Sequence, residues 1–177
     1  MDSTVRVWDA KTGYEHWLYL FFLLRFSYQK KIFKINRECL ALLQGHSALV
    51  CQLQLSPTIL ATGGSDGRVI TFSLETYTAL QRIAAHDSSV ISLQFDKNFL
   101  VTGGNDGRVR LYETETGNYV RELNEPGECV WKVAFVKHTC AIMCKRAGKT
   151  VVEIWSLGKA AKRLRFEETR KGDSALC

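Results

Sequence analysis

A seven-residue stretch occurs twice in this sequence, as GGSDGRV at residues 63–69 and as GGNDGRV at residues 103–109, 40 residues later. Each copy follows a short apolar run and precedes an alternating one. An Asp-Gly pair between two such runs predicts a tight β-hairpin, because glycine accepts the positive φ that the turn requires. Repetition at this period predicts structural units that bury their apolar faces by stacking on copies of one another.

Short apolar runs recur in step with these turns and predict four β-strands per period. Four short strands in about 40 residues, without helical periodicity, are typical of the blades of a β-propeller. The sequence therefore predicts an all-β fold, a partial propeller of antiparallel four-stranded blades with about two complete blades and two partial ones. The expected strands lie at residues 39–43, 50–55, 59–62 and 69–74, then 79–83, 90–95, 99–102 and 109–113, and in a degenerate third cycle 119–123, 130–136, 140–145 and 151–157.

The repeat period divides the chain into four parts. Residues 1–13 are interpreted as the end of a truncated repeat, since Asp2 precedes Trp8 by the same six residues as Asp66 precedes Phe72. Residues 14–37 form an insert, residues 38–157 carry the repeats, and the basic residues 158–177 are expected to be a disordered tail. In the third cycle the turn at residues 145–150 is predicted to be longer than in the other two.

The insert does not follow the repeat pattern. Asp2 and Asp66 stand 64 residues apart, which exceeds the period by 24, the length of the insert. Its apolar part, residues 17–24, is too short to span a membrane. Residues 19–24 are apolar all round rather than amphipathic. A long apolar loop remains an alternative, but we interpret the insert as a retained intron or mis-spliced segment. Mature transcripts that carry these codons as the dominant form would contradict this hypothesis.

Charge and cysteine usage exclude several classes of protein. The net charge is +6, but the excess of basic residues lies in residues 14–37 and 158–177. The repeats therefore have no patterned basic face of the kind that would predict nucleic-acid binding. The six cysteines lack a disulfide-type spacing and most lie in apolar runs. No secretory cleavage pattern is present. We therefore expect reduced thiols in an intracellular protein, nuclear or cytoplasmic, that binds neither nucleic acid nor membrane.

The repeats resemble the WD-repeat family through Gly45-His46, the turn residues Asp66 and Asp106, and Trp8-Asp9. In that family a His, a Ser or Thr, the turn Asp and a Trp form a hydrogen-bonded chain within each blade. The resemblance implies two such structural networks, in which Phe72 and Tyr112 replace the Trp; their members are His46, Thr62 and Asp66, and His86, Thr102 and Asp106. A buried His needs partners for both ring nitrogens, which such a network would supply.

Three segments, residues 2–9, 93–99 and 130–133, are similar to the closing blades of F-box/WD-repeat proteins. Those proteins are substrate receptors of SCF-type ubiquitin ligases, and the similarity is to the cell-division-control type with eight blades. The resemblance implies an F-box that docks the ligase and face arginines that bind phosphorylated substrates. No F-box occurs in this chain, and the positions that match the arginines are Cys51, Ser65, Ile91, Asn105 and Trp131. The fragment is thus expected to lack both ligase docking and degron binding.

Other loop residues remain as candidates for contacts with protein partners. Together with three of the positions above they form a predicted interaction face: Ser47, Leu49, Ser65, Ser88, Asn105 and Trp131.

Catalytic and metal-binding interpretations are disfavoured by the same spacing. The His and Asp residues could belong to a catalytic triad, but their duplication at the repeat period favours structure. Cys140 and Cys144 would lie about 13 Å apart on one strand, too far to share a zinc ion. No helix or Gly-Lys-Ser/Thr follows the Gly-Gly pairs, so a phosphate loop is not predicted. We expect no enzyme activity, no cofactor, no metal and no small-molecule substrate.

Three functional hypotheses follow. The first is the C-terminal part of an SCF substrate receptor, with phosphorylated substrates as partners of the whole protein. The second is a generic WD-repeat scaffold of another complex. The third is an inactive truncated product, which would aggregate or be retained by chaperones, because an open array exposes sheet edges and an uncovered blade face.

Overall fold

The computed structural model describes residues 3–10, 17–21, 39–157 and 163–164. The secondary-structure elements within these ranges are β-strands arranged in antiparallel sheets. No helix in the described ranges is long and apolar enough to cross a membrane. The predicted all-β fold of stacked four-stranded blades is confirmed.

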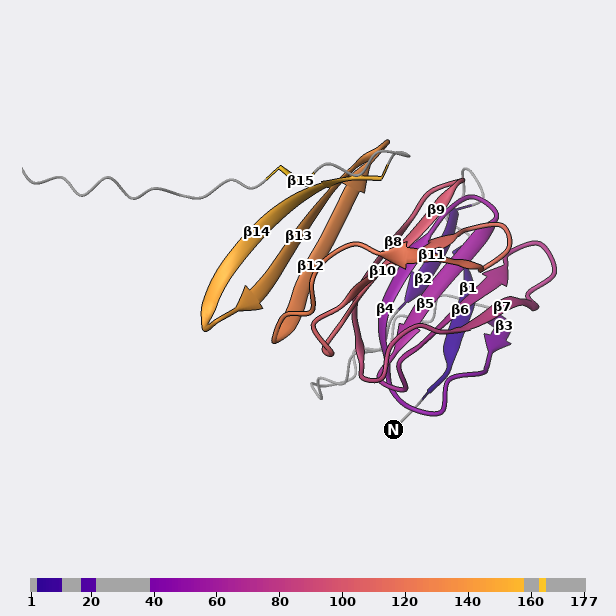
Figure 1. The fold of residues 1–177 in the computed structure, drawn as a ribbon. Helices are drawn as coiled ribbons and strands as arrows, with labels where there is room; N and C mark the ends of the chain where they lie inside the picture. Colours follow the sequence, from indigo (N-terminus) through magenta and orange to yellow (C-terminus); the bar gives the residue numbers. More distant parts are fainter. Residues whose placement is uncertain (1–2, 11–16, 22–38, 158–162, 165–177) are drawn as a thin grey trace, which may run out of the picture.

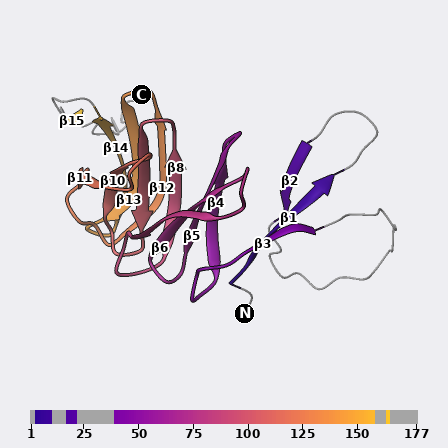
Figure 2. The ribbon, with the colours of Figure 1, turned by 90° about the vertical axis from the view of Figure 1, so that its right-hand side faces the viewer.

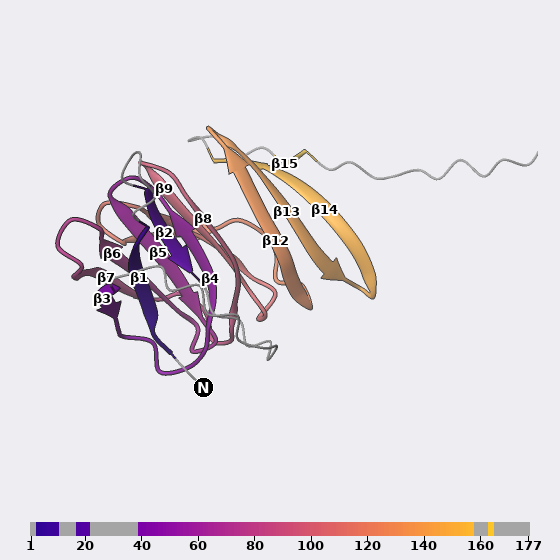
Figure 3. The same ribbon diagram turned by 180° about the vertical axis from the view of Figure 1, so that it is seen from behind.

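Three sheets have the same strand order, in which each strand pairs with its neighbour along the chain, and they lie side by side as successive layers (Figures 1 and 3). We call them blades I, II and III. Blade I contains β4 (Val50–Leu55), β5 (Ile59–Gly64), β6 (Arg68–Ser73) and β7 (Ala79–Ala84); blade II contains β8 (Val90–Phe95), β9 (Phe99–Gly104), β10 (Val109–Glu113) and β11 (Tyr119–Glu122); blade III contains β12 (Cys129–Val136), β13 (Thr139–Arg146), β14 (Lys149–Ser156) and β15 (Arg163–Leu164).

A fourth sheet of three strands adjoins blade I and is the partial blade of this structure (Figure 2). Its order is β2-β1-β3, with β1 spanning Val5–Ala10, β2 Trp17–Phe21 and β3 Cys39–Leu43. Val5 and Val7 of β1 pack in one cluster with residues of blade I such as Val50 and Leu60. Comparison with β5-β6-β7 shows that β1 and β3 hold the places of the third and fourth blade strands.

Strand β2 comes from the segment predicted to be an insert, and it pairs antiparallel with β1. It holds the place that β5 has beside β6 in blade I. An unpaired strand edge leaves backbone N–H and C=O groups without partners. By pairing with β1, β2 provides hydrogen-bond partners for the groups along that edge of β1. The rest of residues 14–37 lies outside the described residues, and the splicing hypothesis stays a prediction.

The basic tail was predicted to be disordered, but Arg163 and Leu164 form β15. They pair with Trp155 and Ile154 at the edge of β14. The sequence gives no strand signal for two residues in a charged segment, and the pairing follows from the open edge of β14. The other residues of 158–177 lie outside the described residues.

The turn of blade III is shorter than the sequence predicted. Arg146 pairs with Lys149, so only Ala147 and Gly148 connect β13 to β14. Both residues have positive φ, 49° and 74°, as two-residue hairpin turns require. The additional residues of the third cycle lengthen its strands to eight residues each. The predicted long turn over residues 145–150 was therefore wrong.

Neighbouring blades are joined by a side-chain clamp that recurs with the repeat. Gln54 of blade I donates from Nε2 to the carbonyl oxygen of Phe95 in blade II at 3.0 Å and accepts the Phe95 N–H at 2.6 Å. Gln94 makes the same pair of bonds to Phe135 of blade III, at 2.8 and 2.7 Å. Each glutamine thus satisfies one backbone donor and one acceptor across the interface between blades.

Glycine lets the blades approach closely beside this clamp. A Cβ atom at Gly63 would lie 2.7 Å from Cγ1 of Val90, and one at Gly103 would lie 2.7 Å from Cγ1 of Val130. In blade III the residues 40 positions later are Met143 in place of Gly103 and Ala134 in place of Gln94. The outer face of blade III therefore offers neither the clamp nor the recess that blades I and II offer to the next blade.

Replacing Gln94 with Ala should remove both bonds to Phe135 and leave its backbone groups unpaired at the interface. We expect a loss of about 1–3 kcal/mol in the free energy of unfolding and faster hydrogen exchange at the Phe135 amide. Urea denaturation and hydrogen exchange measure the two effects. The exposed Gln44 provides the control, since Gln44→Ala should change neither. Unchanged exchange at Phe135 in Gln94→Ala would contradict the clamp.

Candidate interaction face and the buried His–Thr–Asp networks

The first predicted network is assembled from a loop, a strand and a turn. His46 lies in the loop from β3 to β4, Thr62 on β5, and Asp66 in the turn from β5 to β6. Nδ1 of His46 lies 3.0 Å from Oδ1 of Asp66, and its Nε2 lies 2.9 Å from the Thr62 hydroxyl. The backbone N–H groups of Ser47 and Arg68 donate to the Asp66 carboxylate at 2.9 and 3.1 Å.

Blade II repeats this arrangement atom for atom. Nδ1 of His86 lies 3.0 Å from Oδ1 of Asp106, and Nε2 lies 2.9 Å from the Thr102 hydroxyl. The side chain of His86 is fully buried, and 11% of the Asp106 side chain is exposed. The structure thus brings together all six residues that the resemblance implied for the two networks. In each blade they join the loop before the first strand to the turn between the second and third strands.

Burial and hydrogen bonding act in opposite directions on the charges of these networks. Burial alone would raise the pKa of Asp66, but the N–H donors of Ser47 and Arg68, together with His46, hold that pKa below its usual value. For His86 burial has the larger effect and lowers the pKa, although the carboxylate of Asp106 opposes it. The fold therefore stabilises an ionised Asp66 and a neutral His86.

The order of atoms, carboxylate to Nδ1 and hydroxyl to Nε2, is the order found in a catalytic triad. Thr62, however, is completely buried, and its hydroxyl donates to the carbonyl oxygen of Ile70 at 3.1 Å. A substrate has no access to an oxygen in that position. At the expected position of the Trp, Phe72 is buried without a polar group, and Tyr112 donates to the carbonyl oxygen of Ala85 at 3.3 Å. The geometry supports a structural role for both networks.

Blade III has a different buried network, which the sequence analysis missed. Pro126 stands where the His would be, and Arg146 instead pairs with Glu153 at 3.2 Å. Glu153 is only 2% exposed, and it accepts the indole N–H of Trp155 at 3.0 Å. Arg146 also donates to the carbonyl oxygen of Glu125, in the loop before β12, at 2.8 Å. A glutamate within the apolar run of β14 was the available sequence signal.

The predicted interaction-face residues lie at one end of the blades, where the loops before the first strands meet the turns after the second strands. The N–H of Ser65 donates to the carbonyl oxygen of Leu49 at 2.8 Å, which brings these two residues together. Ser47 and Asn105 are exposed, Ser88 is half-buried, and Trp131 is 42% exposed.

The positions that would carry phosphate-binding arginines have a common geometry. Cys51, Ile91 and Trp131 are each the residue skipped by a register shift at the start of the first blade strand. Such a bulge turns a side chain out of the regular pairing. The Cys51 thiol lies 3.0 Å from the hydroxyl of Ser65, so a bulge residue and a turn residue adjoin within one blade. An arginine at either position would reach the same part of the face.

A hollow of about 540 Å³ opens beside the first network. The hydroxyl-bearing Ser3, Thr4 and Ser47 line it together with the side chain of Arg82. Gly45 has a φ of 153°, a backbone conformation that favours glycine at this position.

The cysteines of blade III do not form a metal site in the described part of the chain. No group of three metal-ligating side chains is found in the described residues. Cys140 is completely buried, and burial raises the pKa of its thiol to about 12. Cys140 is therefore a protonated thiol of the core at neutral pH.

Comparison with known proteins identifies the repeats. The family model "WD domain, G-beta repeat" matches residues 37–73 and 77–113. Residues 37–113 therefore carry two WD40 repeats, and the chain has the fold of a WD-repeat protein. No match is found among curated protein sequences.

Solved structures with the same architecture include designed and natural proteins. The computationally designed protein Ika4 is 26% identical, with a TM-score of 0.62 over 68% of this chain and 74% of that one. The β-propeller domain of Cps50 (Swd1) from Myceliophteria thermophila has a TM-score of 0.60 at 18% identity, and a chain of the mitotic checkpoint complex has 0.63 at 22%. These matches cover 71% of this chain and 41% of each of those two chains.

Replacing Asp66 with Ala should leave His46 and the N–H groups of Ser47 and Arg68 without their acceptor. We expect a loss of about 2–4 kcal/mol in the free energy of unfolding, measured by urea denaturation. The exposed Asp87 is the matched control, and Asp87→Ala should cost less than about 0.5 kcal/mol. Equal losses in the two variants would show that the Asp66 network does not stabilise the blade.

Acidification should destabilise the protein through His86. Its folded-state pKa lies below the ordinary value of about 6.5, so the unfolded chain binds the proton first and unfolding is favoured as pH falls below that value. The free energy of unfolding should decrease as the pH is lowered from neutrality, in denaturation curves recorded along a pH series. His86→Asn should reduce this slope. A slope unaffected by His86→Asn would contradict the assignment.

Proposed function

We propose that this chain is a non-catalytic protein-interaction module that corresponds to the closing blades of an F-box substrate-recognition subunit in phosphodependent SCF ubiquitination. One observation carries the interaction role. The side chains that recur with the repeat and have catalytic potential, such as His46 and Asp66, are buried and hydrogen-bonded within the blade, whereas the face residues Ser47, Leu49 and Asn105 are accessible.

Several observations support the more specific ubiquitin-ligase proposal. Residues 2–9, 93–99 and 130–133 resemble the closing blades of that family. The bulge and turn positions that adjoin at Cys51 and Ser65 give blade I a place at which face arginines would converge. A chain of the mitotic checkpoint complex shares the fold, which supports assembly with other proteins as a use of such blades.

In this proposal the chain by itself does not bind a phosphorylated degron. Phosphate recognition by guanidinium groups needs arginine at the converging positions, which hold none here. Ligase docking and phosphate binding then belong to other parts of the whole protein, and this chain supplies scaffold and rim contacts. A generic WD-repeat scaffold is the second candidate, because the same buried networks and exposed loops would serve any protein partner.

A gain-of-function experiment separates the two candidates. Asn105→Arg combined with Trp131→Arg places arginines at two exposed positions of the face. If this face has the degron-receptor geometry, the variant should bind a phosphothreonine peptide at least about tenfold more tightly than the unaltered chain does, since a charge-assisted bond contributes about 1.5–3 kcal/mol. Fluorescence anisotropy with phosphorylated and unphosphorylated peptides measures the gain.

The matched control places the same two charges at the opposite end of the blades. Asn98 and Asn118 are exposed in turns there, and Asn98→Arg with Asn118→Arg should give no gain for the phosphorylated peptide. Equal gains in the two double variants, or none in the Asn105 and Trp131 variant, would contradict the receptor geometry and favour the generic scaffold.

A further inference from the structure

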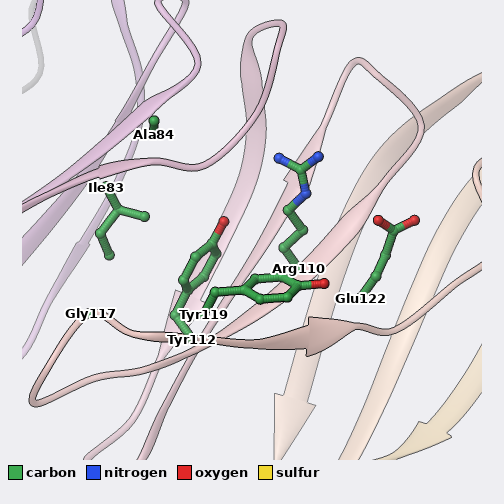
Figure 4. A pocket seen from close by; sticks show the side chains of 7 residues that line it. All are labelled: Ile83, Ala84, Arg110, Tyr112, Gly117, Tyr119 and Glu122. Carbon is green, nitrogen blue, oxygen red and sulfur yellow. The ribbon is translucent and has the colours of Figure 1, made fainter.

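A second hollow, of about 430 Å³, lies between blades I and II. Ile83 of β7 lines one side, Arg110 and Tyr112 of β10 line the base, and Tyr119 and Glu122 of β11 line the other side. Figure 4 shows the two tyrosine rings close together, with the Arg110 and Glu122 side chains standing beside them. We call this hollow the tyrosine groove.

The two aromatic rings form a corner. The ring centroids of Tyr112 and Tyr119 lie 5.8 Å apart, and the ring planes meet at 70°. Tyr112 is only 4% exposed, whereas Tyr119 is 57% exposed. The ring of Tyr119 thus presents flat apolar surface, and Tyr112 packs against it from within the buried core.

The polar groups of the groove include hydrogen-bond donors. Arg110 donates from Nη1 to the carbonyl oxygen of Ala85, and a guanidinium has five N–H groups in all. The Tyr119 hydroxyl makes no hydrogen bond within the described part of the chain. Glu122 is paired with Arg108 at 2.8 Å, so its charge is balanced by an arginine outside the groove lining. The groove therefore offers donors and apolar surface without a strong excess of either charge.

Comparison of the blades shows that the fold does not require this set of residues. The residues 40 positions earlier in blade I are Ile70 for Arg110, Phe72 for Tyr112, Ala79 for Tyr119 and Arg82 for Glu122. Yet the residues that hold a blade together, the His–Thr–Asp network and the glutamine clamp, are the same in both. Blade I forms the same four-stranded sheet without Arg110, Tyr119 and Glu122, so the blade fold does not need these three side chains, whereas Tyr112 and Phe72 are both buried core aromatics.

We propose that the tyrosine groove binds an extended proline-rich peptide segment of a partner protein. A polyproline II segment has no internal hydrogen bonds, so its carbonyl oxygens are open acceptors. Its pyrrolidine rings pack on aromatic side chains, and its preformed shape lowers the entropy lost on binding. The exposed ring of Tyr119, supported from behind by Tyr112, provides the ring contact, and Arg110 and the Tyr119 hydroxyl donate to the carbonyls.

This inference rests on the proposed interaction role but uses residues distinct from the loop face. Its test is the binding of a fluorescein-labelled oligoproline peptide to the full chain, followed by fluorescence anisotropy. A Gly-Ser peptide of equal length and oligoglutamate and oligolysine peptides serve as comparisons. We expect saturable binding of oligoproline and weaker binding of the other three.

Two variants assign the binding to the groove. Tyr119→Ala removes the exposed ring, and Arg110→Ile installs the residue that blade I carries at the same position; each should weaken binding about fivefold or more. Leu80→Ala is the matched control, because Leu80 lies on β7 outside the groove lining and is 52% exposed, close to the exposure of Tyr119. Urea denaturation should show that the Tyr119 variant folds as the unaltered chain does.

Several outcomes would overturn the inference. These are equal binding of the Gly-Ser peptide, tighter binding of either charged peptide, unchanged affinity in both groove variants, and an equal loss in Leu80→Ala. The loop-face experiment with Asn105→Arg and Trp131→Arg is unaffected by these results. Failure of oligoproline binding together with a gain for the phosphothreonine peptide would remove this inference and leave the proposed function in place.

Discussion

The turn that carries the Asp of each network makes the hydrogen bonds on which both the interior of the blade and its contact with the next blade depend. Asp66 holds His46 of its own blade, while the carbonyl oxygen of the next residue, Gly67, accepts the N–H groups of Ala85 and His86 at 3.0 and 2.9 Å. A Cβ at Gly67 would collide with the carbonyl of His86, and its φ of 72° favours glycine for a second reason. One turn thus joins the loop of its own blade to the loop of the next.

The same contact recurs at Gly107, whose carbonyl oxygen accepts the N–H of Gly127 at 3.0 Å, and it ends at blade III. There the turn consists of Ala147 and Gly148. The salt bridge from Arg146 to the buried Glu153 closes the interior of this blade instead. The Arg146–Glu153 salt bridge and Met143 on the outer face distinguish blade III from blades I and II, each of which packs against a following blade.

The members of the two networks could be predicted because the resemblance to the WD-repeat family implied their roles and the repeat period placed the second set 40 residues after the first. His86 to Asp106 spans 20 residues, as His46 to Asp66 does, and the distances agree within the two networks. The Arg146–Glu153 pair has no second copy, so no comparison within the sequence could show that the two meet. The turn of blade III was mispredicted because a longer spacing was assigned to a loop, whereas pairing across β13 and β14 absorbed it.

The distinction between repeated and unrepeated residues also bears on function. Gln81 of β7 donates from its carboxamide to the carbonyl oxygens of Thr114 and Glu115. These bonds connect β7 to blade II next to the tyrosine groove. The residue 40 positions later is Arg121, which donates to the carbonyl of Ser156 in blade III at 3.0 Å, so this tether is kept while its chemistry changes. Side-chain bonds at this repeat position therefore fix the spacing between neighbouring blades, and the residues that line the groove between blades I and II are not those that make these bonds. A recurring scaffold with a lining particular to one blade is the arrangement expected of a binding site, because rigid support and specific contacts then come from different residues.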